Sequence, residues 1–367
     1  MFKSALAALF SALIVLTTAP AAQAAASGQS ASHKQHAAKR VVAKGPRGKV
    51  RAVASARPRA GKVIINVRGK KVVSYRPVRS ANFVMPRSAG DVAGLNLTTD
   101  QVGLASNVAF VLDQTSSEVL FEKNANVSLP IASITKLMTG LVVVQAQQDM
   151  HEVLSITDGD IDHEKHTSSR LTIGARMTRG DLLHIALMSS ENRAASALGR
   201  NYPGGINAFV GAMNAKARQL GMRDTHYVDS SGLSSRNVSS GRDLAKLVMA
   251  AHGDPVLREF STTPNSTVQA SGRTMHYRNT NYLVSLPDWN IGLQKTGFIN
   301  EAGRCLVMQA MIHGRNVVMV FLDSKGKMSR TADAGRIRRL IESLPDRMDV
   351  DAIRPSTITA SAPGLAR

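Results

Sequence analysis

Hydrophobic and polar residues alternate between strand-like and helix-like patterns from residue 108 to residue 344. Two short apolar runs at 108–113 and 119–122 flank a polar turn, which predicts two antiparallel strands. Apolar residues then recur at helical spacing in the segments 132–144, 179–188, 192–200, 206–220 and 241–251. Strand-like runs return at 267–283, 291–296, 305–311 and 317–322, before a basic amphipathic helix at 330–344. This order predicts an α/β fold of the α+β kind, an antiparallel sheet flanked by helices with a helical subdomain.

The segment 25–90 has a different amino-acid composition. It is rich in Ala, Lys, Arg, Gly and Pro and has few large apolar side chains. Burial therefore cannot offset the entropy cost of ordering it, and we expect a basic, mostly disordered linker. The apolar runs at 63–67 and 71–75 are an exception, because they flank a Gly-containing turn and predict a small hairpin.

The N-terminus has the pattern of an export signal. Lys3 precedes the apolar run 5–16, and Ala22-Gln23-Ala24 is a small-residue cleavage site. We expect a signal peptide at 1–24, cleaved near Ala24, and a periplasmic location for the rest. The expected enzyme domain is 91–345, followed by a flexible tail at 346–367. Cys305 is the single cysteine, which excludes an internal disulfide.

Charge is distributed unevenly along the chain. The net charge is +20, but residues 25–90 hold 16 Lys and Arg and no acidic residue, whereas residues from Asp91 onward hold 29 basic and 26 acidic residues. The basic charge therefore belongs to the linker, and export argues against a nucleic-acid partner. Two interpretations stay open for the linker: electrostatic contact with anionic envelope surfaces, or a solvated tether.

Three short motifs carry candidate chemistry. They are Ser133-Ile134-Thr135-Lys136, Ser190-Glu191-Asn192 and Lys295-Thr296-Gly297. Ser133 opens a predicted helix, and Lys136 lies three residues on, on the same helical face. A lysine acts as a base only when neutral, and its ordinary pKa is about three units above neutral pH. Desolvation in a cleft and a second cation, Lys295, would supply the shift.

The other two motifs complete the predicted cleft. Ser190 stands in the break between two predicted helices and would relay a proton to the leaving nitrogen, while Asn192 would hold a substrate amide. The motif from Lys295 through Thr296 to Gly297 ends a predicted strand. Gly297 permits close approach of a substrate that pairs as an added strand, and the Lys295 ammonium suits a substrate carboxylate.

The ordered trio resembles the low-molecular-mass penicillin-binding proteins, the D-alanyl-D-alanine endopeptidase and carboxypeptidase family of serine peptidases, over about 108–344. Segments 182–189, 229–233 and 297–303 share the resemblance. The segments around Ser190 and Lys295 look most like the endopeptidase branch, which cleaves D-alanyl-meso-diaminopimelate crosslinks. The resemblance implies a penicillin-binding/β-lactamase-like fold, peptidoglycan stem peptides and crosslinks as partners, and β-lactams as inhibitors.

The resemblance also implies roles for individual residues. Ser133 would form the acyl-enzyme, Lys136 would accept its proton and Ser190 would assist the leaving group. Asn192, Lys295, Thr296, Gly297 and Phe298 would bind substrate. The backbone N–H groups of Ser133 and Phe298 would form the oxyanion hole.

Other functions remain as alternatives. The site would equally serve a D-alanyl-D-alanine carboxypeptidase that trims stem peptides, and a non-catalytic envelope-binding protein is a third candidate. A β-lactamase is disfavoured because the one Glu between the second and third motifs, Glu259, has no Asn four residues later. We expect no metal or cofactor, since the acidic run 158–162 has His163 and Ser169 where a calcium loop needs Gly and Glu.

Overall fold

The computed structural model describes residues 61–67, 70–76 and 87–345. The signal peptide predicted at 1–24, the tail predicted at 346–367 and most of the linker predicted at 25–90 lie outside these ranges. Two strands lie within the linker segment, β1 (Gly61–Val67) and β2 (Lys70–Arg76). They pair antiparallel, with Gly61 opposite Arg76 and Val67 opposite Lys70, which confirms the predicted strand pair.

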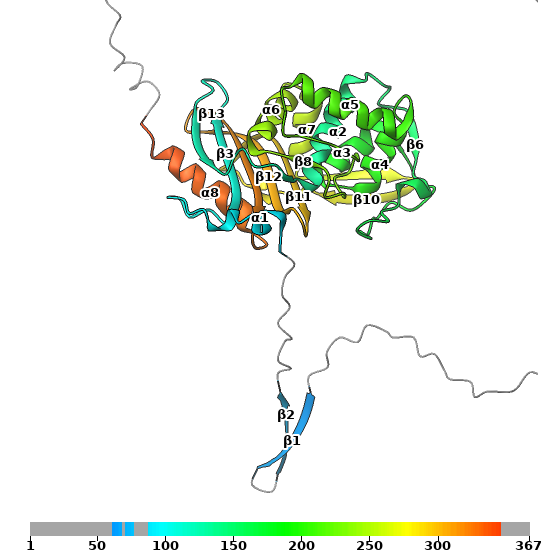
Figure 1. The fold of residues 1–367 in the computed structure, drawn as a ribbon. Coiled ribbons are helices and arrows are strands. Elements are labelled where there is room, and N and C mark those ends of the chain that lie inside the picture. The colour runs from blue at the N-terminus through cyan, green and yellow to red at the C-terminus, as the bar shows by residue number, and fades with distance from the viewer. Residues whose placement is uncertain (1–60, 68–69, 77–86, 346–367) are drawn as a thin grey trace, which may run out of the picture. The chain divides into compact units, whose positions relative to one another are not determined.

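The larger unit is built on a five-stranded antiparallel sheet in the order β11-β12-β13-β3-β4 (Figure 1). The strands are β3 (Ser106–Asp113), β4 (Val119–Lys123), β11 (Asn290–Ile299), β12 (Gly303–Ile312) and β13 (Arg315–Ser324). All five occupy the segments that the sequence predicts. β11, which carries the third motif, is an edge strand of this sheet.

The sheet separates two hydrophobic cores, because alternate residues of a strand point to opposite faces. On β3, Val108 and Phe110 join the core beneath the helical part, whereas Ala109 and Val111 join a second core with Ile337. Ile337 belongs to α8 (Ser329–Glu342), the predicted C-terminal helix. Helices cover both faces (Figure 1), which explains why β3 and β13 are almost continuously apolar.

The helical part lies between β4 and β11 in the chain. Its helices are α2 (Thr135–Gln145), α3 (Arg179–Met188), α4 (Asn192–Arg200), α5 (Gly205–Gln219), α6 (Gly241–His252) and α7 (Pro255–Thr262). The first five confirm the predicted segments. α7 was not predicted, although Asp254 caps it by accepting a hydrogen bond from the Leu257 N–H at 3.1 Å, and Pro255 stands in its first turn.

Short elements complete the unit. The pairs are β5 (Leu129–Pro130) with β8 (Val238–Ser239), β6 (Val153–Ser155) with β7 (Arg176–Thr178), and β9 (Asn265–Ala270) with β10 (Arg273–Arg278). The helix α1 (Ala89–Val92) begins just before the boundary expected at residue 91. Among the helices that the structure describes, none is both long and apolar enough to cross a membrane.

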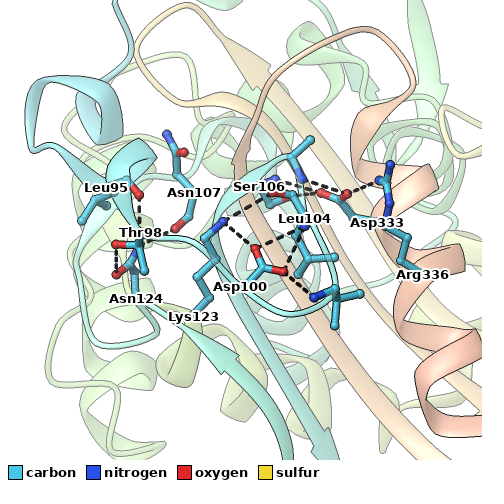
Figure 2. Close-up of polar contacts among 12 residues, drawn as sticks. Leu95, Thr98, Asp100, Leu104, Ser106, Asn107, Lys123, Asn124, Asp333 and Arg336 are labelled. Carbon is cyan, nitrogen blue, oxygen red and sulfur yellow. Dashed lines mark hydrogen bonds and ion pairs between the residues drawn. The ribbon is translucent and has the colours of Figure 1, made fainter. Parts of the chain in front are cut away.

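Two buried acidic residues fasten the beginning of β3 (Figure 2). Asp333 of α8 accepts hydrogen bonds from the backbone N–H of Ala105 at 3.0 Å and of Ser106 at 2.9 Å, and from Ser106 Oγ at 2.6 Å. Asp100 forms an ion pair of 2.9 Å with Lys123 of β4, and both side chains are buried. These contacts connect α8 to the beginning of β3, and β4 to the segment that precedes β3.

Candidate active site

Ser133 lies in a sharply bent entry to α2. The 3-10 turn Ala132–Ile134 precedes the helix, and Ala132 has a φ of +49°, a left-handed conformation that alanine rarely adopts. Gly232 lies against this turn so closely that an added Cβ would be 2.0 Å from the Ala132 carbonyl oxygen. The surrounding backbone therefore holds the strained turn in place, and with it the Ser133 hydroxyl.

Lys136 lies fully buried one turn further along α2. Its Nζ is 2.9 Å from Ser133 Oγ, 2.7 Å from Asn192 Oδ1 and 2.6 Å from the Ser231 carbonyl oxygen. The last two oxygens only accept hydrogen bonds. A neutral amine therefore donates its two hydrogens to Asn192 and Ser231, and its lone pair faces the Ser133 hydroxyl.

The pKa of Lys136 suits a proton acceptor. Burial lowers this pKa from 10.5 to about 8, although the carboxylates of Asp229 and Glu191 act in the opposite direction. Desolvation, one of the two predicted causes, therefore lowers this pKa. The other predicted cause, the charge of Lys295, is not among those that act on Lys136. Near pH 8 about half of the amine is neutral and able to accept the Ser133 proton.

Ser190 occupies the turn between α3 and α4 with a φ of +64°, another left-handed position without glycine. Its Oγ accepts a hydrogen bond of 2.9 Å from Lys295 Nζ, which also donates to the Thr296 carbonyl oxygen at 3.0 Å. Lys295 is fully buried, and burial together with the charges of Lys136 and Arg330 holds its pKa well below the ordinary value. The second and third motifs therefore meet directly.

The third motif also lies against the first. An added Cβ on Gly297 would be 2.9 Å from the Ile131 carbonyl oxygen and 3.1 Å from the backbone nitrogen of Ser133. Only glycine allows β11 to pass so near the start of α2. The next side chain, Phe298, is 48% exposed, and the Arg304 guanidinium lies 4.6 Å from its ring centroid.

Asn192, which the sequence predicts to hold a substrate amide, has hydrogen-bond partners at both ends of its own amide. Its Oδ1 accepts from Lys136, and its Nδ2 donates to Thr167 Oγ1 at 2.9 Å. Thr167 Oγ1 in turn donates to Asp162 Oδ2 at 2.7 Å. Because each partner has a defined donor or acceptor role, this series of hydrogen bonds fixes which end of the Asn192 amide faces Lys136.

The loop that carries Thr167 is organised by Asp162. Burial acts to raise the pKa of Asp162, but hydrogen bonds from the backbone N–H groups of Lys165, Thr167 and Glu164 and from the Thr167 hydroxyl outweigh it and lower the pKa to about 2. Asp160 is engaged as well, accepting from Ser196 Oγ at 2.8 Å and from Arg200. The acidic run thus stabilises a loop. No cluster of three potential metal ligands occurs in the described ranges.

Two further supports were not predicted as site residues. Asp229 accepts hydrogen bonds from the backbone N–H of Ser231 at 2.6 Å and of Gly232 at 2.5 Å, and so positions the Ser231 carbonyl that contacts Lys136. Arg330 of α8 donates to the Gly297 carbonyl oxygen at 2.8 Å. The Asp-Ser-Ser-Gly sequence signals the first as a tight turn, whereas the second depends on how α8 packs.

Comparison with known proteins places this geometry in context. A family model described as D-alanyl-D-alanine carboxypeptidase matches residues 96–326. A D-alanyl-D-alanine endopeptidase of Pseudomonas aeruginosa is 49% identical over 253 residues, covering 68% of this chain and 81% of the relative. One of Escherichia coli is 43% identical over 248 residues, covering 67% and 80%. Several D-alanyl-D-alanine carboxypeptidases also match, at 25% to 31% identity.

A solved structure agrees on the fold. The crystal structure of the Streptomyces K15 DD-transpeptidase superposes with a TM-score of 0.62 at 28% identity, covering 67% of this chain and 100% of that chain. The antiparallel sheet with helices on both faces is therefore the fold that the sequence predicts.

Proposed function

This chain belongs to the D-alanyl-D-alanine carboxypeptidase family of serine peptidases, and we propose that it hydrolyses D-alanyl-meso-diaminopimelate crosslinks of peptidoglycan through an acyl-enzyme on Ser133. The observation that carries this assignment of the nucleophile is the position of Lys136 Nζ, 2.9 Å from Ser133 Oγ, with its two other contacts made to obligate acceptors. Among the partners of the amine within residues 87–345, Ser133 is therefore the one that can supply a proton.

Acylation then follows from the contacts. Ser133 Oγ attacks the D-alanyl carbonyl carbon while Lys136 Nζ takes the hydroxyl proton, and a C–O bond forms as the carbonyl π bond opens. We assign the backbone N–H groups of Ser133 and Phe298 to the resulting oxyanion, which agrees with the close passage of Gly297 by Ser133. Thr296 and the edge strand β11 would align the substrate backbone.

Collapse of the tetrahedral intermediate requires a proton on the leaving nitrogen. Ser190 Oγ accepts a hydrogen bond from Lys295, so the hydrogen of Ser190 itself is available for that nitrogen. The C–N bond breaks, the second strand departs with the Ser190 proton, and Ser133 is left as an ester. Lys136 passes the proton that it took from Ser133 to Ser190, which leaves the Lys136 amine neutral. Water then attacks the ester while Lys136 accepts a proton from that water and returns it to Ser133 Oγ, which releases the first strand as a carboxylic acid and restores the Ser133 hydroxyl.

The endopeptidase branch is favoured over the carboxypeptidase alternative by identity. Two endopeptidase relatives are 49% and 43% identical to this chain. The carboxypeptidases are more distant, at 31% or less. Digestion of purified crosslinked muropeptide dimers tests the choice directly. We expect conversion to monomers by the wild type and none by Ser133→Ala. Release of single D-alanine from pentapeptides without dimer cleavage would favour the carboxypeptidase.

We propose the periplasm as the site of action, after removal of residues 1–24, because peptidoglycan is the substrate. The enzyme domain would then be carried at 91–345 behind the basic linker at 25–90. The 16 positive charges of the linker suit an anionic envelope surface. Salt-sensitive sedimentation with envelopes that is lost on deleting 25–90 would support this contact, and unchanged sedimentation would leave the linker a tether.

A further inference from the structure

A hollow of about 670 Å³ opens beside the turn that carries Ser190. Ser189 and Glu191, the residues on either side of Ser190, line it together with loop residues 168–170 and residues 276–278 of β10. Its volume lies within the range of ligand-binding pockets, roughly 300–1,000 Å³. Ser133 and Lys136 do not line it, so this space extends the active site beyond the reacting atoms.

Two guanidinium groups give the hollow a positive character. Arg170 lies over the ring of Tyr277, 3.8 Å from its centroid, and donates one hydrogen bond of 2.5 Å to the His276 carbonyl oxygen. Arg278 is exposed, and its guanidinium has no ion pair or hydrogen bond to any residue that the structure describes. The carboxylate in the wall, Glu191, is buried and accepts from Ser169 Oγ at 2.7 Å. An anionic ligand would therefore meet guanidinium donors that are still available.

The Tyr277 hydroxyl is a third, independent feature of the same wall. The side chain is 1% exposed, and the hydroxyl oxygen has no hydrogen-bond partner within residues 87–345. Buried hydroxyl groups nearly always have a partner, because an unmade hydrogen bond away from water is unfavourable. Because Tyr277 lines the hollow, a molecule bound there could supply the missing partner after a small movement of this side chain.

The position of Ser190 indicates which part of the substrate reaches the hollow. Ser190 protonates the leaving nitrogen in the proposed function, so the leaving strand passes next to the Ser190 turn. In a crosslink, this strand is a second stem peptide that carries several carboxylates. In the carboxypeptidase reaction, only a single D-alanine leaves, and nothing would extend into the hollow.

We propose that this hollow binds the acidic stem peptide of the leaving strand, with carboxylates held by Arg170 and Arg278 and one polar group by the Tyr277 hydroxyl. The inference rests on the proposed function and names the feature that selects crosslinks over single stem peptides. Because the contacts lie away from the reacting carbonyl, they stabilise bound substrate and transition state alike. Their loss raises KM more than it lowers kcat.

The test compares a substrate that has a leaving strand with one that has none. The variants are Arg170→Gln, Arg278→Gln and Tyr277→Phe, and the matched control is Arg273→Gln, an exposed arginine of β10 outside this lining. Each is assayed with purified muropeptide dimers and with benzylpenicillin, which lacks a second stem peptide. We expect kcat/KM for dimers to fall roughly 5- to 20-fold in the arginine variants, as for loss of a charge-assisted hydrogen bond. The rate of benzylpenicillin acylation in these variants stays within about twofold of the wild-type rate. Arg273→Gln should show wild-type rates, within about twofold, for both dimer cleavage and acylation.

If the wild type cleaves dimers, two results would overturn this inference and leave the endopeptidase assignment intact. One is dimer cleavage by all three variants at the wild-type rate. The other is an equal loss in dimer cleavage and in benzylpenicillin acylation, which would indicate damage to the site common to both. A wild type that is acylated but leaves dimers intact would instead overturn the endopeptidase assignment, and the inference with it.

Discussion

Lys136 Nζ and Ser133 Oγ lie 2.9 Å apart, and the other hydrogen-bond partners of the amine are both acceptors. The two other oxygens around the amine, from Asn192 and Ser231, accept hydrogen bonds and cannot donate them. Because Lys136 is fully buried, no bulk water competes for its lone pair. The account of this protein as an acyl-enzyme hydrolase depends on this pair.

The first prediction concerns pH. Burial lowers the pKa of Lys136 to about 8, so the protonated form, which cannot accept the Ser133 proton, dominates below that pH. The rate of acylation by benzylpenicillin should rise about tenfold per pH unit up to about pH 8 and then level off. Lys136→Arg, which stays charged, should not be acylated at any of these pH values. A rate that does not change between pH 6 and pH 8 would contradict Lys136 as the base.

Thr167 provides a test of the hydrogen-bond chain behind Asn192. Thr167→Val removes the acceptor for Asn192 Nδ2 and the donor to Asp162, so the amide can rotate and its Oδ1 no longer faces Lys136 reliably. We expect a fall in the acylation rate of roughly tenfold, the kinetic equivalent of one lost hydrogen bond.

Thr167→Ser is the matched control for this position, because it keeps the hydroxyl. It should retain most of the acylation rate and the pH profile of the wild type. Equal losses in the serine and valine variants would show that the methyl group or loop packing matters instead of the hydroxyl.

Gly232 offers a stability test. Its φ is +79°, and an added Cβ would lie 2.0 Å from the Ala132 carbonyl oxygen. Gly232→Ala should reduce the free energy of unfolding by at least about 2–3 kcal/mol, because the neighbouring backbone must move. Gly211→Ala in α5 has no atom within 4 Å of the new Cβ and should be neutral or stabilise by up to about 1 kcal/mol. Thermal unfolding compares the two, and equal melting temperatures would refute the steric argument.

Asp333 tests the coupling of α8 to the sheet. Asp333→Ala leaves the buried N–H of Ser106 and the Ser106 hydroxyl without their acceptor, and the N–H of Ala105 as well. We expect a loss of roughly 3–5 kcal/mol in the free energy of unfolding, measured by denaturant titration. Asp288→Ala, which breaks an exposed pair with Arg338, should change it by less than about 1 kcal/mol. If both substitutions had similar small effects, Asp333 would not be important for attaching α8 to the sheet.

Local sequence features predicted the elements that carry the motifs well. α3 and α4 have the predicted bounds because their starts are capped by side chains next to the apolar pattern, Thr178 and Glu191. Four of the five sheet strands were recognisable because they are largely buried on both faces. The fifth, β4, is partly exposed and was recognisable from its short apolar run after a polar turn. The motif order and the resemblance predicted that Ser190 and Lys295 share one cleft, but not the hydrogen bond between them.

Contacts made by loops could not be predicted in the same way. The sequence around Asp162 was recognisable as a failed calcium loop, but nothing local showed that Thr167 would reach Asn192, 25 positions away. Arg330 appeared as one of several basic residues on an amphipathic helix, and its contact with Gly297 depends on the packing of α8 against the sheet. The hollow beside Ser190 joins three segments far apart in the chain and has no local pattern at all.

The most direct test of the central claim is mass spectrometry of the purified protein after incubation with benzylpenicillin, with Ser133→Ala alongside. The account predicts a stable penicilloyl adduct on the peptide that contains Ser133, and no adduct in the variant. Folded wild-type protein that remains unmodified, or an adduct on another residue that persists in Ser133→Ala, would contradict it.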